Sequence, residues 1–160
     1  MARQTLNKQE TQNLVKLLKK VRLPAPYPVF IALCKSVPMV AVNLAVMPDN
    51  RRLLLTYRND EFYKGWHIPG SILRYKENPL DVLKRVSRQE LKMKIKSPRF
   101  VNYFIENSSR GHELILLFVV RPAGALKKGK YFSLNHPPKD LLKEQVQEVR
   151  RLARLVRGLS

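Results

Sequence analysis

The most pronounced shortage in this 160-residue sequence is of negative charge. Only 12 residues are Asp or Glu, whereas 31 are Lys or Arg, which gives a formal net charge of +19 at pH 7. A surplus of this size favours binding of polyanions, such as phosphorylated small molecules, nucleic acid or an anionic surface. Because the basic residues are spread along the whole chain, an ordinary solvated basic surface is an equal alternative.

The sequence also lacks the segments that cross membranes or direct secretion. No apolar run is long enough to span a bilayer, and the charged N-terminus has no apolar stretch followed by small residues, as a signal peptide would. The single cysteine, Cys34, cannot form an internal disulfide and lies in the apolar run 31–34. We expect it to be a buried small hydrophobe rather than a reactive thiol, and we expect a cytoplasmic protein.

Several common site motifs are missing as well. No Cys/His cluster has the spacing of a zinc site, and no glycine motif of the P-loop or dinucleotide kind occurs. There is no internal repeat, and the length fits one domain with a hydrophobic core. We expect residues 1–27 to form an N-terminal helix with a Pro-rich connector, and residues 28–160 to form the domain.

The N-terminal segment 5–21 has the periodicity of an amphipathic helix. Leu14, Leu17 or Leu18, and Val21 share one face, and lysines occupy the other. Such a helix can lie on a membrane or on nucleic acid, but we favour docking of its apolar stripe on the domain or on a second subunit. From this stripe and the proline-rich connector behind it we predict a homodimer.

The rest of the chain alternates between predicted strands and helices. We expect strands 39–47 and 51–57 to pair through a turn at 48–50, and the near-continuous apolar strand 112–121 to be central in its sheet. The C-terminal stretch 139–157 is predicted to be a helix. These patterns predict an α/β fold, in which a mixed sheet lies between a central helix and the C-terminal helix. Further strands are expected at 99–106 and 127–134, and a helical turn at 29–34.

The central stretch, 66–93, combines a glycine-containing loop with a well-marked helix. Asn78 is suited to cap the helix, and Pro79 fits its first position, where no amide hydrogen is needed. Apolar residues then recur at helical spacing and are expected to form the buried face. They are Leu80, Leu83, Val86 (or Ser87) and Leu91.

This loop and helix resemble the signature of the Nudix hydrolases, which cleave a nucleoside diphosphate linked to another group. Gly70, Glu77, Arg85 and Glu90 occupy the positions of the family's glycine, first glutamate, arginine and last glutamate. The resemblance implies the Nudix fold, an α/β/α sandwich. It also implies Mg²⁺ or Mn²⁺ held by the Glu90 carboxylate and the Gly70 carbonyl, and completed by the diphosphate of the substrate.

Within that family, the pattern is most similar to the GDP-mannose mannosyl hydrolases, whose helix also reads Arg-apolar-Ser/Thr-x-x-Glu-Leu. Their similarity extends to the segment around Phe30, and Asn43 stands where that branch has an Asp. It implies that Glu90 and His112 are catalytic, and that Asn43, Arg58 and Arg85 bind substrate. The alternatives are a structural Arg85–Glu77 pair, a solvent-facing Arg58 and a surface histidine at 112.

Two functions remain open at this point. The first is a hydrolase of a nucleoside diphosphate derivative, most simply a nucleotide sugar such as GDP-mannose. The second is a catalytically impaired Nudix-fold module that binds a phosphorylated ligand or nucleic acid. Glu90 and the similarity of the helix favour the first. The second is favoured by Val86 and Gln89 at the other two carboxylate positions, and by the absence of a Gln and a His from the loop before Tyr131.

Overall fold

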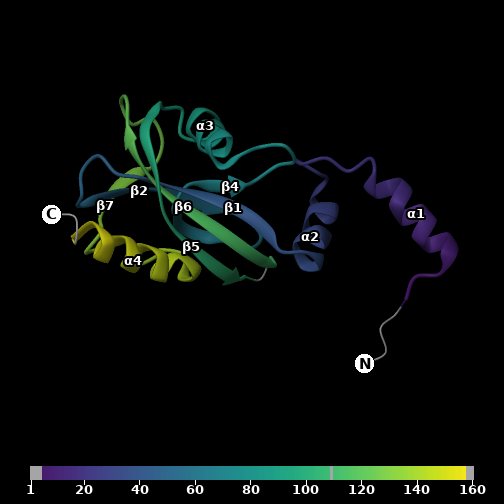
Figure 1. Ribbon diagram of the computed structural model, residues 1–160. Helices are drawn as coiled ribbons and strands as arrows, with labels where there is room; N and C mark the ends of the chain where they lie inside the picture. The colour runs from purple at the N-terminus through teal and green to yellow at the C-terminus, as the bar shows by residue number, and fades with distance from the viewer. Residues whose placement is uncertain (1–4, 109, 158–160) are drawn as a thin grey trace.

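Two β-sheets form the centre of the computed structural model, which describes residues 5–108 and 110–157 (Figure 1). The four-stranded sheet has the order β4-β1-β6-β5, and the three-stranded sheet has the order β3-β2-β7. Helices α3 and α4 lie on opposite sides of the sheets, which confirms the predicted sandwich. The strands are β1 Met39–Val46, β2 Arg52–Asn59, β3 Lys64–His67, β4 Gly70–Ile72, β5 Ile95–Asn107, β6 His112–Pro122 and β7 Lys130–Ser133. The helices are α1 Lys8–Leu18, α2 Tyr27–Ser36, α3 Pro79–Gln89 and α4 Val146–Arg157, with a 3₁₀ turn, η1, at Lys143–Gln145.

The alternation of side chains along the central strands builds two cores. In β1, Val42 and Leu44 pack in the cluster that contains α3, whereas Ala45 packs in the cluster that contains α4. Neighbouring strand residues point to opposite faces, so a strand that is apolar throughout must be covered on both sides. This explains why β1 and β6, both nearly continuous apolar runs, occupy the middle of the four-stranded sheet as predicted for β6.

The predicted pairing of the second strand with the first is wrong. β1 pairs in parallel with β6 and antiparallel with β4, whereas β2 pairs with β3 and β7 in the other sheet. The turn itself is well made, because Asp49 Oδ1 accepts hydrogen bonds from the backbone amides of Arg51 (2.8 Å) and Arg52 (2.9 Å). It reverses the chain, but the two edges of β1 are already occupied by β4 and β6.

Helix α3 begins as predicted and buries a slightly different face. Asn78 Oδ1 accepts hydrogen bonds from the amides of Leu80 and Asp81, and the Asp81 carboxylate accepts one from the Asn78 amide. Leu80, however, is 45% exposed, and Val82 is buried in its place. The first turn reaches past the edge of the sheet, so the buried stripe starts two residues later. It comprises Val82, Leu83, Val86 and Ser87.

The C-terminal helix begins at Val146 rather than at the predicted position 139. Residues 139 and 140 form a turn, after which Leu141 forms a parallel bridge with Trp66 of β3. The Trp66 amide donates to Asp140 O and the Leu142 amide donates to Trp66 O, both at 2.9 Å. These bonds to β3 replace the helical ones. Val149, Leu152 and Val156 form the buried stripe, so Leu152 belongs to it in addition to the predicted residues.

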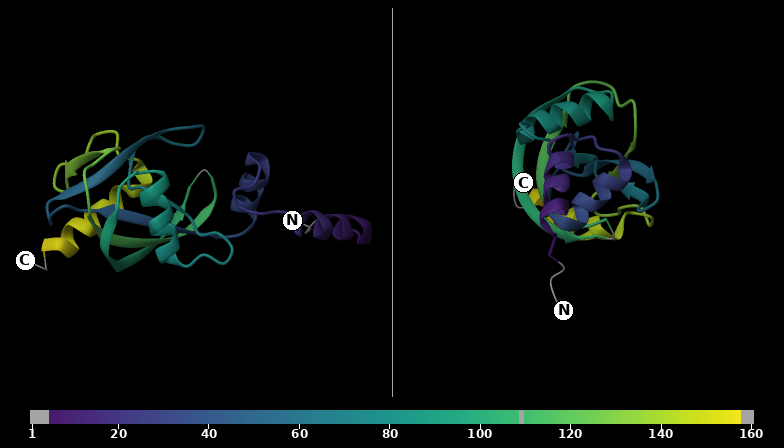
Figure 2. Two further views of the ribbon diagram at one scale, coloured as in Figure 1. Left: turned by 90° about the horizontal axis from the view of Figure 1, so that it is seen from above. Right: turned by 90° about the vertical axis from the view of Figure 1, so that its right-hand side faces the viewer.

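The N-terminal helix α1 projects away from the sheets (Figures 1 and 2). None of its residues is buried, and Leu14, Leu17 and Leu18 are each more than 40% exposed. The predicted docking of this helix on its own domain is therefore wrong, and docking on a second subunit stays a prediction. Within the described residues, no helix is long and apolar enough to cross a membrane. Cys34, in α2, is a free and buried thiol, as expected.

Candidate active site

A cavity of about 660 Å³ opens between the connector after α1, the inner ends of β1 and β2, the β3–β4 segment and the η1 turn. This volume is in the range of small-molecule sites. Four of the predicted site residues line it: Asn43, Arg58, Gly70 and Glu90. Within the described chain, Glu77, Arg85 and His112 are not part of the lining.

Glu90 is presented to the cavity by the C-terminal end of α3. It is the C-cap residue, and its amide donates to Val86 O at 2.9 Å. Burial raises the pKa of its carboxyl group, and the nearby charges of Lys128 and Arg58 act in the opposite direction. The carboxylate is therefore a partly desolvated negative charge between cations, which is a suitable environment for binding a metal ion together with phosphate oxygens.

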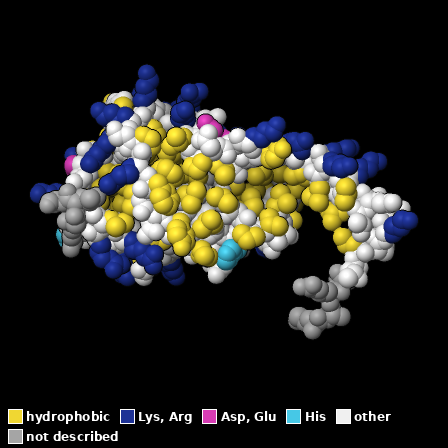
Figure 3. Space-filling model, in the orientation of Figure 1, with side chains coloured by type: hydrophobic (Ala, Val, Ile, Leu, Met, Phe, Trp, Pro, Cys, Tyr) yellow, Lys and Arg dark blue, Asp and Glu magenta, His cyan; other side chains and the backbone are white. Residues whose placement is uncertain are grey.

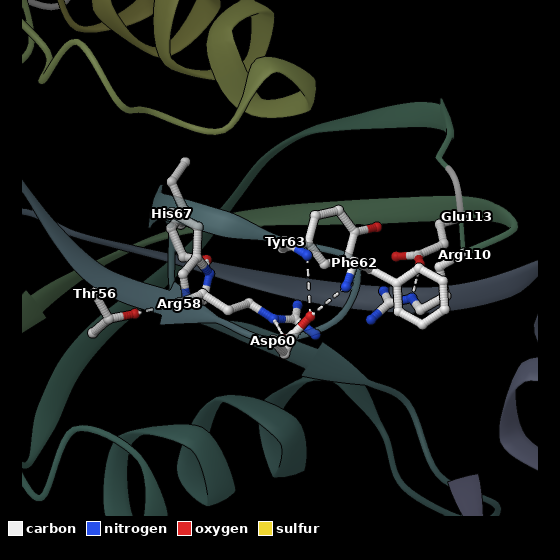
Figure 4. Close-up of polar contacts among 9 residues, drawn as sticks. Thr56, Arg58, Asp60, Phe62, Tyr63, His67, Arg110 and Glu113 are labelled. Carbon is white, nitrogen blue, oxygen red and sulfur yellow. Dashed lines mark hydrogen bonds and ion pairs between the residues drawn. The ribbon is translucent and has the colours of Figure 1, made fainter. Parts of the chain in front are cut away.

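Thr56 and His67, which the sequence did not single out, support Glu90 from the adjacent strands β2 and β3. Thr56 Oγ1 lies 3.0 Å from His67 Nε2, and His67 Nδ1 lies 2.9 Å from Ile68 O (Figure 4). A carbonyl oxygen only accepts, so Nδ1 carries the hydrogen and Nε2 of the neutral ring accepts from Thr56. Burial, with a contribution from Arg58, lowers the pKa of His67 to about 4.

The Thr56 hydroxyl also interacts with the Glu90 carboxyl group. A hydroxyl has one hydrogen, and neutral His67 and ionised Glu90 both require it. Both contacts of Thr56 are therefore satisfied only when either His67 or Glu90 carries an additional proton. Thr56 and His67 are brought together by the register of β2 and β3, in which they are direct partners. Only a correct prediction of this register could have identified them from the sequence.

Gly70 and Asn43 form the wall next to Glu90. The two residues are register partners on β4 and β1, and a side-chain carbon at position 70 would lie 2.1 Å from Asn43 Oδ1 and 2.8 Å from Val42 O. Only glycine fits there. Asn43 is buried, and its Nδ2 donates to Glu148 Oε1 at 3.0 Å and to Oε2 at 3.2 Å.

Arg58 extends along the cavity wall from the end of β2. Its guanidinium forms an ion pair with Asp60 and lies over the Tyr63 ring, 4.5 Å from the ring centre (Figure 4). Asp60 also accepts hydrogen bonds from the amides of Phe62 (3.0 Å) and Tyr63 (3.1 Å), which folds the loop into a compact turn. The predicted diphosphate-binding arginine is therefore held at the cavity by its own loop.

A concentration of carboxyl groups at the far end of the cavity contrasts with the basic exterior (Figure 3). Glu106 and Glu113 are cross-strand partners on β5 and β6, and Arg110 pairs with Glu113. Burial, with the charges of Glu113 and Glu144, raises the pKa of Glu106 to about 7. Five of the chain's 12 acidic residues line this cavity, namely Asp60, Glu90, Glu106, Glu113 and Glu144.

Arg85 and Glu77 form a paired contact that fastens the loop to the helix. Arg85 Nε and Nη2 donate to the two oxygens of Glu77 at 2.7 and 2.8 Å, and the guanidinium also contacts Ser71 Oγ and Ile72 O, both at 3.0 Å. The guanidinium lowers the pKa of Glu77. These contacts correspond to the structural alternative for Arg85, and its predicted place on the substrate is not seen in this geometry.

His112 lies at the outer end of β6, apart from Glu90. Its ring contacts the Asn107 side chain, and it borders a separate shallow hollow with Ser36 and Ser108. The strand alternation explains this position, because the next residue, Glu113, is the one that points into the cavity. Among the described residues, His112 is therefore not part of the lining of the cavity that contains Glu90, and a catalytic part for it stays a prediction.

A divalent cation has few protein ligands available here. Among the described residues there is no group of three or more His, Cys, Asp or Glu side chains placed to hold a metal ion. Val86 is 3% exposed in the core and Gln89 is exposed to solvent, and neither side chain is a carboxylate. Glu90 and Gly70 fit a cation that the phosphate oxygens of a substrate complete.

Comparison with known proteins identifies the architecture. The structure is similar to that of a MutT Nudix hydrolase of Burkholderia pseudomallei, with a TM-score of 0.62 and 17% identity, covering 74% of this chain and 98% of that one. It is also similar to a UDP-X diphosphatase, with a TM-score of 0.62 and 16% identity, covering 98% of this chain and 74% of that one. The chain therefore has the Nudix fold.

In sequence, the chain is 27% identical to an ADP-ribose pyrophosphatase of Methanocaldococcus jannaschii. The match covers 64% of this chain and 66% of that protein, slightly under two thirds of its length. No family model matches the sequence.

Proposed function

We propose that this chain is a Nudix-type, divalent-metal-dependent hydrolase of a nucleoside diphosphate derivative. The observation that supports the proposal is that Glu90 and Gly70 both line a cavity that also contains cationic side chains. Arg58, Arg74 and Lys128 supply these charges. Arginine forks and lysine ammonium groups bind phosphate oxygens well, and the Nudix pattern supplies the reaction class.

Each residue has a distinct part in this account. Glu90 would hold the cation, which would neutralise negative charge on the diphosphate. Arg58 and Lys128 would bind the phosphate oxygens from the opposite side, and Thr56 with His67 would keep the Glu90 carboxyl group in place. Arg85 and Glu77 act indirectly, by fixing the loop that carries Gly70.

For the substrate, we propose a nucleotide sugar or ADP-ribose. GDP-mannose is included because of the Arg85–Leu91 similarity, and ADP-ribose because of the name of the curated relative. This chain differs from the mannosyl hydrolases in one respect: its loop before Tyr131 lacks their Gln and His. This difference supports cleavage within the diphosphate over release of the sugar.

A binding module is the second candidate function. The specific observation in its favour is the single carboxylate at the cation position, with buried Val86 in place of a second. Such a module would bind a phosphorylated ligand, or nucleic acid through the net charge of +19, and affinity for nucleic acid would fall steeply with added salt.

A hydrolysis screen over ADP-ribose, UDP-sugars and GDP-sugars, with Mg²⁺ or Mn²⁺, separates the two functions. We expect turnover of at least one compound, abolished by a chelator, with a nucleoside monophosphate among the products resolved by chromatography. Absence of turnover over the panel, together with salt-sensitive binding of RNA, would support the binding module instead.

A further inference from the structure

Asn43, which lines the cavity, and buried Glu148 behind it form a pair that the proposed chemistry does not use. Asn43 is 6% exposed and Glu148 is 2% exposed, and they lie 105 residues apart in the chain. Both oxygens of Glu148 face the same amide nitrogen, Asn43 Nδ2. Burial raises the pKa of Glu148 to about 7, and the bond from Asn43 counteracts part of this effect.

Hydrogen-bond chemistry fixes which end of the amide faces Glu148. In the structure, Asn43 Nδ2 faces both Glu148 oxygens and the Asn43 carbonyl oxygen faces away. This is the arrangement that an ionised carboxylate, which only accepts, requires. On the other side, the oxygen lies against Gly70, where a side-chain carbon would approach to 2.1 Å. An oxygen fits against the Cα–H of glycine, whereas an NH₂ group with two hydrogens would not.

The carbonyl oxygen of this amide is open to the cavity. Asn43 lines the cavity, yet Oδ1 accepts no hydrogen bond among the described residues. In the same part of the chain, no fully buried side-chain nitrogen or oxygen lacks a partner. Oδ1 is therefore an acceptor that a bound molecule can reach, next to Gly70.

We propose that Glu148 is a positioning residue that holds Asn43 in one orientation, so that the wall beside Gly70 presents a hydrogen-bond acceptor to the substrate. The substrate group it fits is a donor, such as a hydroxyl of ribose or of a sugar. The substrate part of this inference rests on the proposed function, but the orientation of the amide does not.

Two swaps of nearly equal size test the orientation. In Glu148→Gln, the side chain at position 148 can accept from Asn43 Nδ2 through its oxygen or donate to Asn43 Oδ1 through its NH₂ group, so it no longer holds the Asn43 amide in one orientation. In the double variant Asn43→Asp/Glu148→Gln, the amide at position 148 donates to one carboxylate oxygen at position 43, and the other oxygen again faces the cavity. The exposed neighbour Gln147, substituted by Ala, is the control.

The first readout needs neither substrate nor substitution. In the ¹⁵N-labelled chain, the side-chain NH₂ hydrogens of Asn43 are expected to exchange with solvent on the order of tenfold or more slowly than those of exposed Asn13. Glu148→Gln is expected to shift the Asn43 NH₂ resonances and speed their exchange, whereas Gln147→Ala leaves both unchanged. Rapid exchange of the wild-type Asn43 NH₂ group would overturn the proposal, even if the chain hydrolyses nothing.

The second readout uses whichever nucleotide sugar, or ADP-ribose, is turned over. We expect Glu148→Gln to raise KM about tenfold with little change in kcat, and the double variant to restore KM. A structural role alone would lower the melting temperature without this rescue. If the KM of the double variant were as high as that of Glu148→Gln, at equal thermal stability, the assignment of a hydrogen-bond acceptor to the cavity wall would be overturned.

Discussion

At position 86 the family pattern calls for a carboxylate, and this chain carries a valine that packs in the core beside Leu83. The substitution turns a residue of the cation site into part of the hydrophobic interior. Gln89, at the other altered position, is exposed to solvent. In the proposed function, the cation would therefore be held by Glu90 and the ligand.

Glu148 also makes stability depend on pH. Its pKa is about 7 in the folded chain against 4.5 for an ordinary glutamate, so the folded state binds more protons between these values. Stability from this residue is fully present below about pH 4.5 and is lost as the pH rises through 7. His67 acts in the opposite sense between its lowered pKa of about 4 and 6.5.

Comparing variants isolates the contribution of Glu148. The unfolding free energy of both proteins is to be measured in urea between pH 5 and pH 7.5. As the pH rises, the value for Glu148→Gln should increase relative to that of the wild type. His67 is present in both proteins and cancels. Parallel curves for the two proteins would contradict the raised pKa.

The motif gave Gly70, Glu90 and the Glu77–Arg85 pair, because local spacing on a loop and helix determines their relative positions. It could not give Thr56, His67 or Glu148. Thr56 meets His67 through the register of β2 and β3, and Glu148 reaches Asn43 from a helix 105 residues away. No local pattern encodes these long-range meetings.

Among the elements, the loop and helix from Gly70 to Glu90 act as one unit. The Arg85 guanidinium makes four contacts, with Glu77, Ser71 and Ile72, in the partly buried space between β4 and α3. These contacts determine how the helix end that carries Glu90 sits relative to Gly70.

Arg85→Lys is expected to weaken this unit. A lysine ammonium cannot reproduce the paired contact with both Glu77 oxygens, and the variant should unfold with about 1–3 kcal/mol less free energy in urea. Arg88→Lys, on the exposed side of the same helix, should change stability by less than about 0.5 kcal/mol. Equal stability of the Arg85 variant and the wild type would show that the pair contributes nothing.

Elements with strong local signals were predicted well. The cap at Asn78 and the proline at 79 located the start of α3, and the apolar run of β6 located the central strand. The pairing of β1 with β2 was predicted wrongly, and the start of α4 was placed too early, because both depend on competition from other strands. β4 and β6 occupy the edges of β1, and the backbone bonds of Asp140 and Leu142 to Trp66 hold this segment beside β3 instead of in the helix.

For the whole molecule, charge is unevenly distributed between surface and cavity. On the face shown in Figure 3, lysine and arginine side chains lie around the margins of a hydrophobic middle, while five of the 12 acidic residues line the cavity. The surface field attracts anions generally. The cavity itself is lined by both signs of charge, because Arg58, Arg74, Arg110 and Lys128 line it beside the acidic residues. We expect it to favour a ligand that combines an anionic portion with a donor-rich one.

The projecting helix α1 leads to a prediction about assembly. Its exposed Leu14 and Leu17 have no contact that buries them on their own domain, and we expect them to be covered by a second copy. Sedimentation velocity at micromolar concentration should show a homodimer, and Leu14→Lys/Leu17→Lys should sediment as a monomer. A monomeric wild-type chain would contradict this prediction.

The hydrolysis rate of Glu90→Gln, compared with that of Gln89→Ala on the same turn, tests the central claim most directly. With a substrate found in the screen and saturating Mg²⁺, we expect Glu90→Gln to lose on the order of 100-fold in kcat/KM, about 2.7 kcal/mol of transition-state stabilisation. Gln89→Ala should keep nearly the full rate. Equal activity of the Glu90 variant and the wild type would contradict the assignment of this cavity as a cation-dependent catalytic site.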